Sequence, residues 1–495
     1  MATTDPLILV LDEGTTSTRA LLFGLDGAIH AVSQRPLAAA HPPPGWVEQD
    51  AGAIWAATLA CARDTVAAAG GPHRISAIGI ANQRETVIAW DRTSGEPLAP
   101  AIIWQDRRTA EACENLRRGG HEDTIARQTG LVVDPYFSAT KCRWLIDHVS
   151  AVAEAKAVGR LMLGTIDSWL TYKLTGGAHL TDASNASRTQ LMTLDGVGWD
   201  EGLCDLFGVP PGALPAIGDS AGYLASSDPG LLGAAIPIVA MIGDQQAATI
   251  GQGCLAPGAT KATFGTGAFI LTHAGDAPPR SRHRLLSTVL TQIGGRRDYA
   301  LEGSLFVAGS MIQWLRDKLG LIASFPDTEA LARSVGDSGG VTIVPAFAGL
   351  GAPQWRSDVT GSIHGLTLGT GRGEIVRAAL EAVVHQIVDL AEAFAADGHR
   401  WTALRVDGGM IANDWLVQDL ADMLGIEVER PANVESTARG AAMLAAVGAG
   451  FYASLEEAAA AMLPAMSVFT PAMEQGDRRV RLDRWHAVLE AALRP

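Results

Sequence analysis

The chain has 495 residues, with 38 lysines and arginines against 53 aspartates and glutamates, which gives a formal net charge of -15 at pH 7. Hydrophobic residues make up 47% and charged residues 18%, so the composition favours a compact fold over disorder. An acidic chain without a basic tract is not expected to bind nucleic acid, because counterion release requires clustered lysine and arginine. The length predicts two or three domains.

The cysteines and the apolar stretches bear on where the protein works. The five cysteines are widely spaced and include no CxxC pair, so we expect them to be reduced and buried. Residues 1–6 lack the pattern of a secretory signal, and no uncharged stretch reaches the ~20 residues of a membrane span. One such uncharged stretch, 440–455, is rich in alanine and predicts a helix packed inside the fold. We expect a cytoplasmic protein with no integral membrane segment.

The first elements are predicted to be three antiparallel strands, at residues 7–12, 19–23 and 28–33. The dipeptide Asp26-Gly27 is typical of the tight turn that joins the second and third strands. After the prolines of 42–44, Asp50 is expected to cap a helix that runs to about Ala69. Strands at 75–80 and 236–242 then bracket a region in which strands and helices alternate, which predicts an α/β domain.

A second strand–turn–strand segment is predicted to begin near Ala259, where ATKATFGTGAFILTHA echoes the opening segment LDEGTTSTRALLF. A strand at 403–406, the pair Gly408-Gly409 and a helix near Asn413 follow. The echo indicates a boundary near residue 250. We therefore expect an N-terminal domain of residues 1–250 and a C-terminal domain of residues 251–495, facing a shared cleft and hinged at the ends of elements.

Two glycine-containing turns are candidates for a phosphate site. The sequence holds no GxxxxGK[ST] motif, so nucleotide phosphates would have to be bound in another way. In Gly14-Thr15-Thr16-Ser17 and in Gly265-Thr266-Gly267, glycine lets backbone amides approach an anion while hydroxyl groups add donors. Either turn alone could be an ordinary hairpin. Together with Gly408-Gly409 at a strand-to-helix junction, they indicate a site that holds a triphosphate from two sides.

Resemblance to a known family rests on segments that occur in the same order: LDEGTTSTR, NQRET, IIWQDRRT, GDQQAA, FGTGAF, VPAFAGLGAP and RVDGGMIAN. From about Leu7 to about Phe451, the chain resembles the glycerol kinases of the FGGY carbohydrate kinase family. The resemblance implies an α/β, two-domain, actin-like ATPase fold of the ribonuclease H-like class with an interdomain cleft. It also implies ATP-dependent phosphorylation of glycerol to sn-glycerol 3-phosphate in glycerol catabolism, by a dimer or tetramer.

The resemblance assigns a role to each site residue. Asp244 would be the general base for the attacking hydroxyl, and Asp12 and Asp244 would hold Mg²⁺, which an acidic protein needs to receive ATP. Arg84 and Glu85 would offer donors and an acceptor to two hydroxyls. The full glycerol set would be Arg84, Glu85, Trp104, Tyr136, Asp244, Gln245 and Phe269. The ATP set would be Thr15, Thr16, Ser17, Arg19, Gly265, Thr266, Gly309, Gln313, Gly409 and Asn413.

Three departures from the family pattern carry expectations of their own. Glu13 replaces the usual glutamine, and its charge would weaken ATP binding unless strand alternation turns the side chain away. The segment 354–360 differs from that of glycerol kinases and could alter a subunit contact, a regulatory surface or cleft closure. Residues 228–237 contain no basic side chain that could hold a bisphosphate, so we expect no feedback inhibition by fructose 1,6-bisphosphate.

Two other functions stay open from the sequence. The chain could phosphorylate another small polyol or a ketose, although NQRET favours glycerol because this segment looks different in relatives that act on ketoses. It could also be a nucleotide-driven binding protein, since the same ATPase core serves chaperones and filaments. A binding protein needs no acceptor site, so Arg84, Glu85 and Asp244 count against it.

Overall fold

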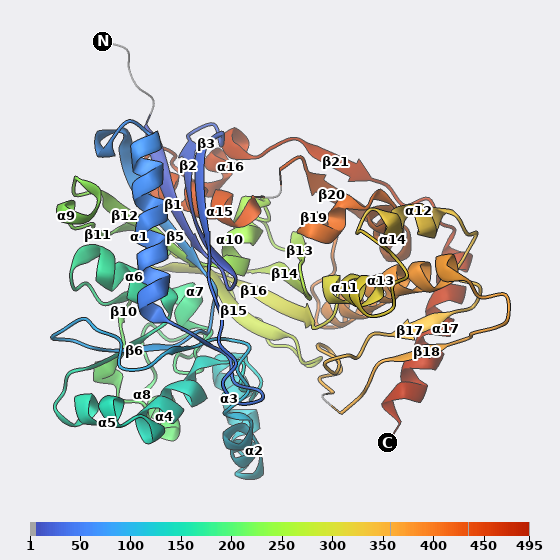
Figure 1. The fold of residues 1–495 in the computed structure, drawn as a ribbon, viewed down its shortest axis with the longest axis horizontal. Helices are drawn as coiled ribbons and strands as arrows, with labels where there is room; N and C mark the ends of the chain where they lie inside the picture. Colours follow the sequence, from blue (N-terminus) through green and yellow to red (C-terminus); the bar gives the residue numbers. More distant parts are fainter. Residues whose placement is uncertain (1–5, 357, 434, 495) are drawn as a thin grey trace.

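The structure is a computed structural model that describes residues 6–356, 358–433 and 435–494. One large sheet runs through the molecule, with the first half of the chain at one end and the second half at the other (Figure 1). Its strand order is β21-β20-β19-β13-β14-β16-β15-β11-β12-β5-β1-β2-β3. These strands are β1 (Leu7–Glu13), β2 (Ser17–Gly24), β3 (Ile29–Pro36), β5 (Ile75–Asn82), β11 (Ala221–Ser226), β12 (Pro237–Gly243), β13 (Thr260–Phe264), β14 (Ala268–Gly275), β15 (Leu286–Ile293), β16 (Arg296–Leu305), β19 (Ala403–Asp407), β20 (Glu427–Pro431) and β21 (Met466–Phe469).

Helices and short sheets complete both halves. The first half holds α1 (Ala51–Ala68), α2 (Ala110–Arg118), α3 (Glu122–Thr129), α4 (Ser138–His148), α5 (Ser150–Ala157), α6 (Ile166–Thr175), α7 (Ala183–Ala186), α8 (Glu201–Phe207), α9 (Pro229–Leu232) and α10 (Asp244–Gly251). The second half holds α11 (Gly309–Asp317), α12 (Asp327–Arg333), α13 (Arg372–Ala396), α14 (Asp414–Leu424), α15 (Ser436–Gly448), α16 (Leu455–Met462) and α17 (Gln475–Leu493). Two-stranded sheets pair β4 (Glu48–Gln49) with β7 (Ala101–Ile102), β6 (Ile88–Asp91) with β8 (Leu161–Gly164), β9 (Leu180–Asp182) with β10 (Ala216–Gly218), and β17 (Thr342–Val344) with β18 (Ser362–His364).

The predicted opening elements are confirmed. β1, β2 and β3 form consecutive antiparallel pairs, and Gly27 has the positive φ of 76° that the turn requires. The Asp50 side chain caps α1 by accepting hydrogen bonds from the backbone amides of Gly52 and Ala53. All five cysteines are buried, as expected. The predicted alanine-rich helix is α15, which ends at Gly448, before the end of the predicted segment.

The echo between the two halves corresponds to a structural repeat. The antiparallel pair β1–β2 has its counterpart in β13–β14, and each pair continues into a parallel neighbour, β5 beside β1 and β19 beside β13. Each Gly-Thr turn therefore joins the two strands of an equivalent hairpin. This equivalence places the two candidate phosphate turns at corresponding positions of the two halves.

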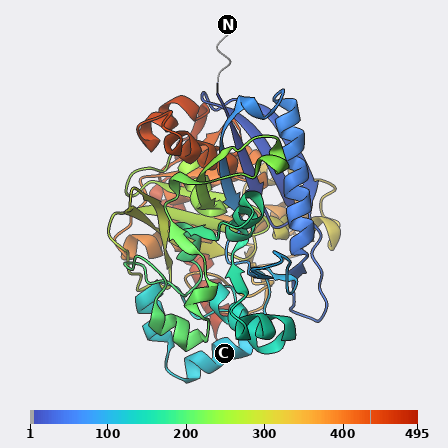
Figure 2. The ribbon, with the colours of Figure 1, turned by 90° about the vertical axis from the view of Figure 1, so that its left-hand side faces the viewer.

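The two faces of β1 are covered by helices from opposite ends of the chain. Leu9 and Leu11 pack in the cluster that contains α1, whereas Ile8 and Val10 pack against the alanines of α15. Figure 2 shows the blue helix α1 and the red helices on opposite sides of the blue strands. The sequence after residue 435 thus completes the core of the first half, and the division of the chain at residue 250 stays a prediction.

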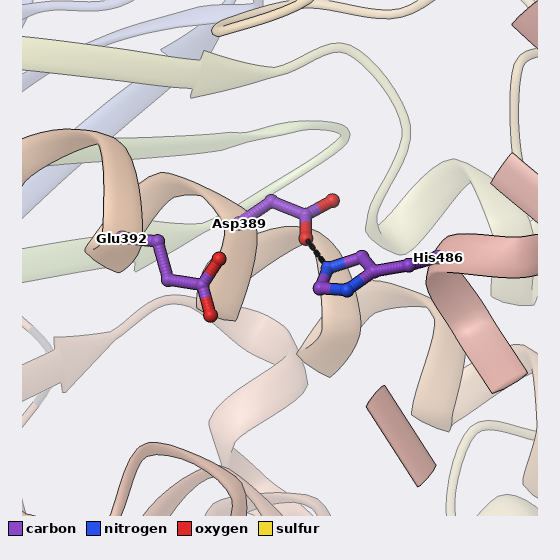
Figure 3. Close-up of side chains that lie close together, drawn as sticks. All are labelled: Asp389, Glu392 and His486. Atoms are coloured by element: carbon purple, nitrogen blue, oxygen red, sulfur yellow. Dashed lines mark hydrogen bonds and ion pairs between the residues drawn. The ribbon is translucent and has the colours of Figure 1, made fainter. Parts of the chain in front are cut away.

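The last helix is held on α13 by polar contacts as well as by apolar packing. In Figure 3, Asp389 and Glu392 of α13 lie beside His486 of α17. One Asp389 oxygen accepts a hydrogen bond from Trp485 Nε1 at 2.9 Å, and the other lies 2.9 Å from His486 Nε2. Across the described parts of the chain, no helix is long and apolar enough to cross a membrane.

Candidate active site

Three parallel strands of the first half end at the same edge of the sheet, and each delivers a polar residue there. Asp12 lies at the end of β1, Arg84 follows β5, and Asp244 follows β12. The register places Asp12 opposite Ala81, while Gly243 lies opposite Asn82. Because carboxyl ends of parallel strands meet at one edge, residues far apart in the sequence converge on one site.

Arg84 is the centre of this convergence. Its side chain is 2% exposed, its Nη1 contacts Glu302 at 2.5 Å, and its Nε lies 3.4 Å from Asp244 Oδ1. Its Nη2 lies 3.4 Å from the Tyr136 hydroxyl, and Nη1 lies 3.3 Å from Gln246 Oε1. One guanidinium therefore joins the predicted base to a predicted glycerol contact.

Glu85 is held in a strained backbone conformation. Its φ of 62° lies in the left-handed region, which a residue with a side chain adopts only at a cost of about 1 kcal/mol or more. The Ser138 hydroxyl donates to the Glu85 carbonyl at 3.0 Å, and Arg188 Nε contacts Glu85 Oε1 at 2.6 Å. These contacts fix the carboxylate beside Arg84.

Aromatic rings form the apolar side of the site. The Trp104 ring lies edge-on to Tyr136, with centroids 5.7 Å apart, and edge-on to Phe269, with centroids 6.2 Å apart. Trp104 Nε1 also donates to Thr15 Oγ1 at 2.8 Å. The predicted glycerol walls thus touch each other, and one of them is bonded to the first candidate phosphate turn.

Asp244 begins α10 and is partly exposed, with 28% of its side chain accessible. Burial raises the pKa of this carboxyl to about 6, against the opposing charge of Arg84, which lowers it. A carboxylate with this pKa is mostly ionised at pH 7 and yet more basic than an ordinary aspartate. Asp244 therefore has the protonation state and the basicity that a general base needs.

The second Gly-Thr turn is built onto the start of α11. The amides of Ala308 and Ser310 donate to the Thr266 carbonyl at 2.9 and 3.1 Å, and that of Gly309 donates to the Gly265 carbonyl at 2.9 Å. Next to this turn lies a cavity of about 380 Å³. Its lining includes the predicted ATP residues Gly265, Thr266, Gly309, Gln313 and Gly409, together with Phe264, Ile312, Arg316, Ile322, Phe325 and Met410.

Two predicted ATP residues already have protein partners in this structure. Asn413 does not line the cavity; it caps α14 by accepting from the Leu416 amide, and its side-chain amide donates to Thr328. Arg19 pairs with Asp12 and, at 2.7 Å, with Glu435, which precedes α15. Thr16 is exposed, and Ser17 Oγ accepts a hydrogen bond from Gln34.

Four buried residues near the site escaped the sequence analysis: Arg188, Gln246, Lys261 and Glu302. Lys261 is buried in β13, and its ammonium contacts Gln245 Oε1 at 2.5 Å and Thr263 Oγ1 at 3.0 Å. Burial lowers the pKa of Lys261 to about 8. The signal that could have found Lys261 and Glu302 is a charge inside an otherwise apolar strand, since such charges are buried only with a partner.

Comparison with known proteins gives two family matches that together span most of the chain. Residues 7–251 match the N-terminal domain of the FGGY family of carbohydrate kinases, and residues 260–449 match its C-terminal domain. The chain is 50% identical to a glycerol kinase of Aromatoleum aromaticum, over 98% of both chains, and 51% identical to a glycerol kinase of Alcanivorax borkumensis, over 97% of both.

Solved structures of carbohydrate kinases have the same fold over nearly the whole chain. The chain is similar to Plasmodium falciparum glycerol kinase with ADP, with a TM-score of 0.93, 33% identity and coverage of 99% of both chains. It is also similar to a xylulose kinase of Rhodospirillum rubrum, with a TM-score of 0.87, 25% identity and coverage of 98% of this chain and 99% of the other. The predicted two-domain α/β kinase fold is confirmed.

Proposed function

The chain belongs to the FGGY family of carbohydrate kinases, and from this premise we propose that it transfers the γ-phosphoryl group of ATP to a terminal hydroxyl of glycerol. The product is sn-glycerol 3-phosphate. The observation that carries the proposal is the contact of Arg84 with both Asp244 and Tyr136, beside an aromatic wall. A base, hydroxyl-binding groups and an apolar surface thus meet in one place, as a small polyol requires.

On the acceptor side, Arg84 donates to hydroxyl oxygens and Glu85 accepts from a hydroxyl, while Trp104 and Phe269 contact the carbon chain. Such a site discriminates strongly against ligands that lack a hydroxyl, because its own buried groups would then lose their partners. Asp244 accepts the proton of the attacking hydroxyl. Because phosphoryl transfer has a loose transition state, that proton needs to leave only late, and a carboxylate suffices as the base.

On the donor side, the two Gly-Thr turns hold the phosphates, and the cavity beside Gly309 and Gly409 receives the adenosine. Apolar lining residues such as Ile322 and Phe325 suit the faces of an adenine ring. In this proposal residues 1–250 carry the first turn and the acceptor side except for Phe269, and residues 251–495 carry the second turn and the adenosine side. Closure of the two halves excludes water from the reaction.

The carboxylates of Asp12 and Asp244 fit a magnesium ion, which prefers oxygen ligands and keeps several waters. When bound, the ion neutralises the negative charge of the phosphates in a protein whose net charge is -15. Arg19, which pairs with Asp12, adds a second positive charge there. A cytoplasmic location and a dimeric or tetrameric state stay predictions.

The test is ADP release by the purified protein with Mg-ATP, comparing glycerol with no acceptor, dihydroxyacetone, erythritol, D-xylulose and L-ribulose. We expect glycerol to give the highest kcat/KM, and Asp244→Asn to lose on the order of 10²–10⁴-fold in kcat. Asp228→Asn is the matched control, since Asp228 is an exposed cap of α9. A better acceptor than glycerol would refute the substrate, and acceptor-independent hydrolysis would favour a nucleotide-driven binding protein.

A further inference from the structure

Four charged side chains form a continuous series of buried ion pairs beside the proposed glycerol site. Arg84 Nη1 contacts Glu302 Oε2 at 2.5 Å, and the other oxygen of Glu302 contacts Arg188 Nη2 at 2.9 Å. Arg188 Nε in turn contacts Glu85 Oε1 at 2.6 Å. Each of the four side chains is at most 2% exposed. We refer to Arg84, Glu302, Arg188 and Glu85 as the ion-pair series.

The series fixes the two glycerol-binding groups relative to each other. Each oxygen of Glu302 is bonded to a different arginine, so the carboxylate cannot rotate without breaking a charge-assisted hydrogen bond. Burial alone would raise the pKa of Glu302, but Arg188 and Arg84 hold that pKa below its ordinary value, so the carboxylate stays ionised. The Arg188 guanidinium also lies over the Tyr136 ring, 5.7 Å from its centroid.

Glu302 and Arg188, the two inner members of the series, leave the outer members Arg84 and Glu85 free to bind a ligand. Arg84 reaches Tyr136 and Asp244 only at 3.4 Å, which is long for a charged donor, so a hydroxyl can replace these contacts. Glu85 uses Oε1 for Arg188, and its Oε2 has no hydrogen-bond partner within the described part of the chain. Each outer residue therefore has one side anchored and one side available.

Stability alone is a poor reason for such an arrangement. Well-packed apolar side chains usually stabilise a core as well as a buried ion pair does, because taking charges out of water is costly. Here two such pairs share one carboxylate, next to a residue with a strained backbone. Strain and buried charge collect at functional sites, where they hold groups in position.

We propose that Arg188 and Glu302 are positioning residues that set the acceptor specificity of the enzyme. They do so by fixing the side chains of Arg84 and Glu85 relative to each other. The inference rests on the proposed function, because it concerns recognition at the same glycerol site. Glu302 lies on β16 in the second half, so residues 251–495 contribute to acceptor choice as well as to the nucleotide side.

The test compares Glu302→Gln and Arg188→Lys with Arg481→Lys. Glu302→Gln keeps the shape and removes the charge, while Arg188→Lys keeps the charge but loses the rigid, planar fork of donors that bonds two carboxylates in a fixed geometry. Arg481 is the matched control: it is 16% exposed and holds Asp419 with two contacts, at 2.6 and 2.9 Å, between α17 and α14. The readouts are KM for glycerol, KM for ATP, and the ratio of kcat/KM for glycerol to that for propane-1,3-diol, which lacks the central hydroxyl.

We expect both variants of the series to raise KM for glycerol at least tenfold, to change KM for ATP less than twofold, and to lower the glycerol preference at least tenfold. Arg481→Lys should leave all three readouts within twofold. Equal changes in both KM values, or an unchanged glycerol preference, would overturn the proposal, as would insolubility of both variants when Arg481→Lys folds. Wild-type protein without glycerol-dependent turnover would refute the proposed function itself.

Discussion

Asp12 and Glu13 are neighbours in β1, yet their side chains lie on opposite faces of the sheet. Asp12 pairs with Arg19 at the edge where the site forms. Glu13 is fully buried on the other face, where it accepts a hydrogen bond from Thr58 of α1 at 2.8 Å. Burial raises the pKa of Glu13 to about 8, so this residue is largely uncharged at pH 7. Strand alternation thus turns Glu13 away from the site, which is the condition under which its charge was not expected to weaken ATP binding.

Glu13→Gln should stabilise the protein in a pH-dependent manner. The pKa of Glu13 lies above its ordinary value only in the folded state, so the carboxyl costs nothing below pH 4.5 and progressively more as the pH rises towards 8. We expect a gain of about 2–4 kcal/mol in the free energy of unfolding at pH 8 and little change at pH 4.5. Urea unfolding at both pH values measures it, with the exposed Glu111→Gln as control. A gain of equal size at both pH values would contradict the burial argument.

Two glycines of the second turn should respond differently to alanine. A Cβ on Gly267 would lie 2.3 Å from the Leu305 carbonyl oxygen, whereas a Cβ on Gly265 meets nothing closer than 3.9 Å. We expect Gly267→Ala to destabilise the protein by about 1–3 kcal/mol, because the backbone of β16 must shift. Gly265→Ala should keep the melting temperature and raise KM for ATP, because the methyl group faces the proposed phosphates. Thermal unfolding and ATP titration separate the two effects, and similar melting temperatures would count against the close approach of Gly267 to β16.

Lys261→Met should separate activity from stability. Burial lowers the pKa of Lys261, so its charge costs folding free energy, and a methionine of similar shape removes that cost. We therefore expect the melting temperature to stay the same or rise. The variant also loses the hydrogen bond that holds Gln245, which is one of the predicted glycerol-binding residues. We therefore expect kcat/KM for glycerol to fall by about 10- to 100-fold. Lys156→Met, at an exposed position of α5, is the control. Unchanged activity would show that Lys261 serves packing alone.

His486→Gln should weaken the attachment of α17 most at low pH. The hydrogen bond to Asp389 raises the pKa of His486 above its ordinary value. The stabilisation is therefore complete below the ordinary histidine value near pH 6.5 and is lost as the pH rises through the raised value. We expect the melting temperature of the variant to fall further below that of the wild type at pH 5.5 than at pH 9. His148→Gln, which removes only a contact within α4, should show no such trend.

Local signals in the sequence predicted what is local in the structure. Asp50 marks the start of α1, the Asp-Gly pair marks the turn before β3, and alternation in β1 places Leu9 and Leu11 on one face and Ile8 and Val10 on the other. The predicted acceptor residues also come together as expected, because most of them follow strands that end at one edge of the sheet. Segment 354–360 includes Ser357, which lies outside the described residues, and its role stays a prediction.

Long-range contacts were beyond the sequence. Arg84 and Glu302 are separated by 218 positions, and Arg188 and Glu302 by 114, so no spacing rule links them. Arg84 was predicted from its motif, whereas neither Arg188 nor Glu302 belongs to a motif that marks it as part of a site. Their significance follows only from tertiary packing, which brings β16 of the second half against the residues after β5.

The packing of α15 against β1 also constrains how the protein folds during its synthesis. The Ile8 and Val10 face of β1 is completed by alanines that the ribosome adds on the order of 190 residues after β12, a delay of roughly 10–40 s at ordinary translation rates. Until then that apolar face has no covering helix. The nascent first half therefore keeps an apolar face uncovered for most of its synthesis, and its final packing waits until the chain is nearly complete.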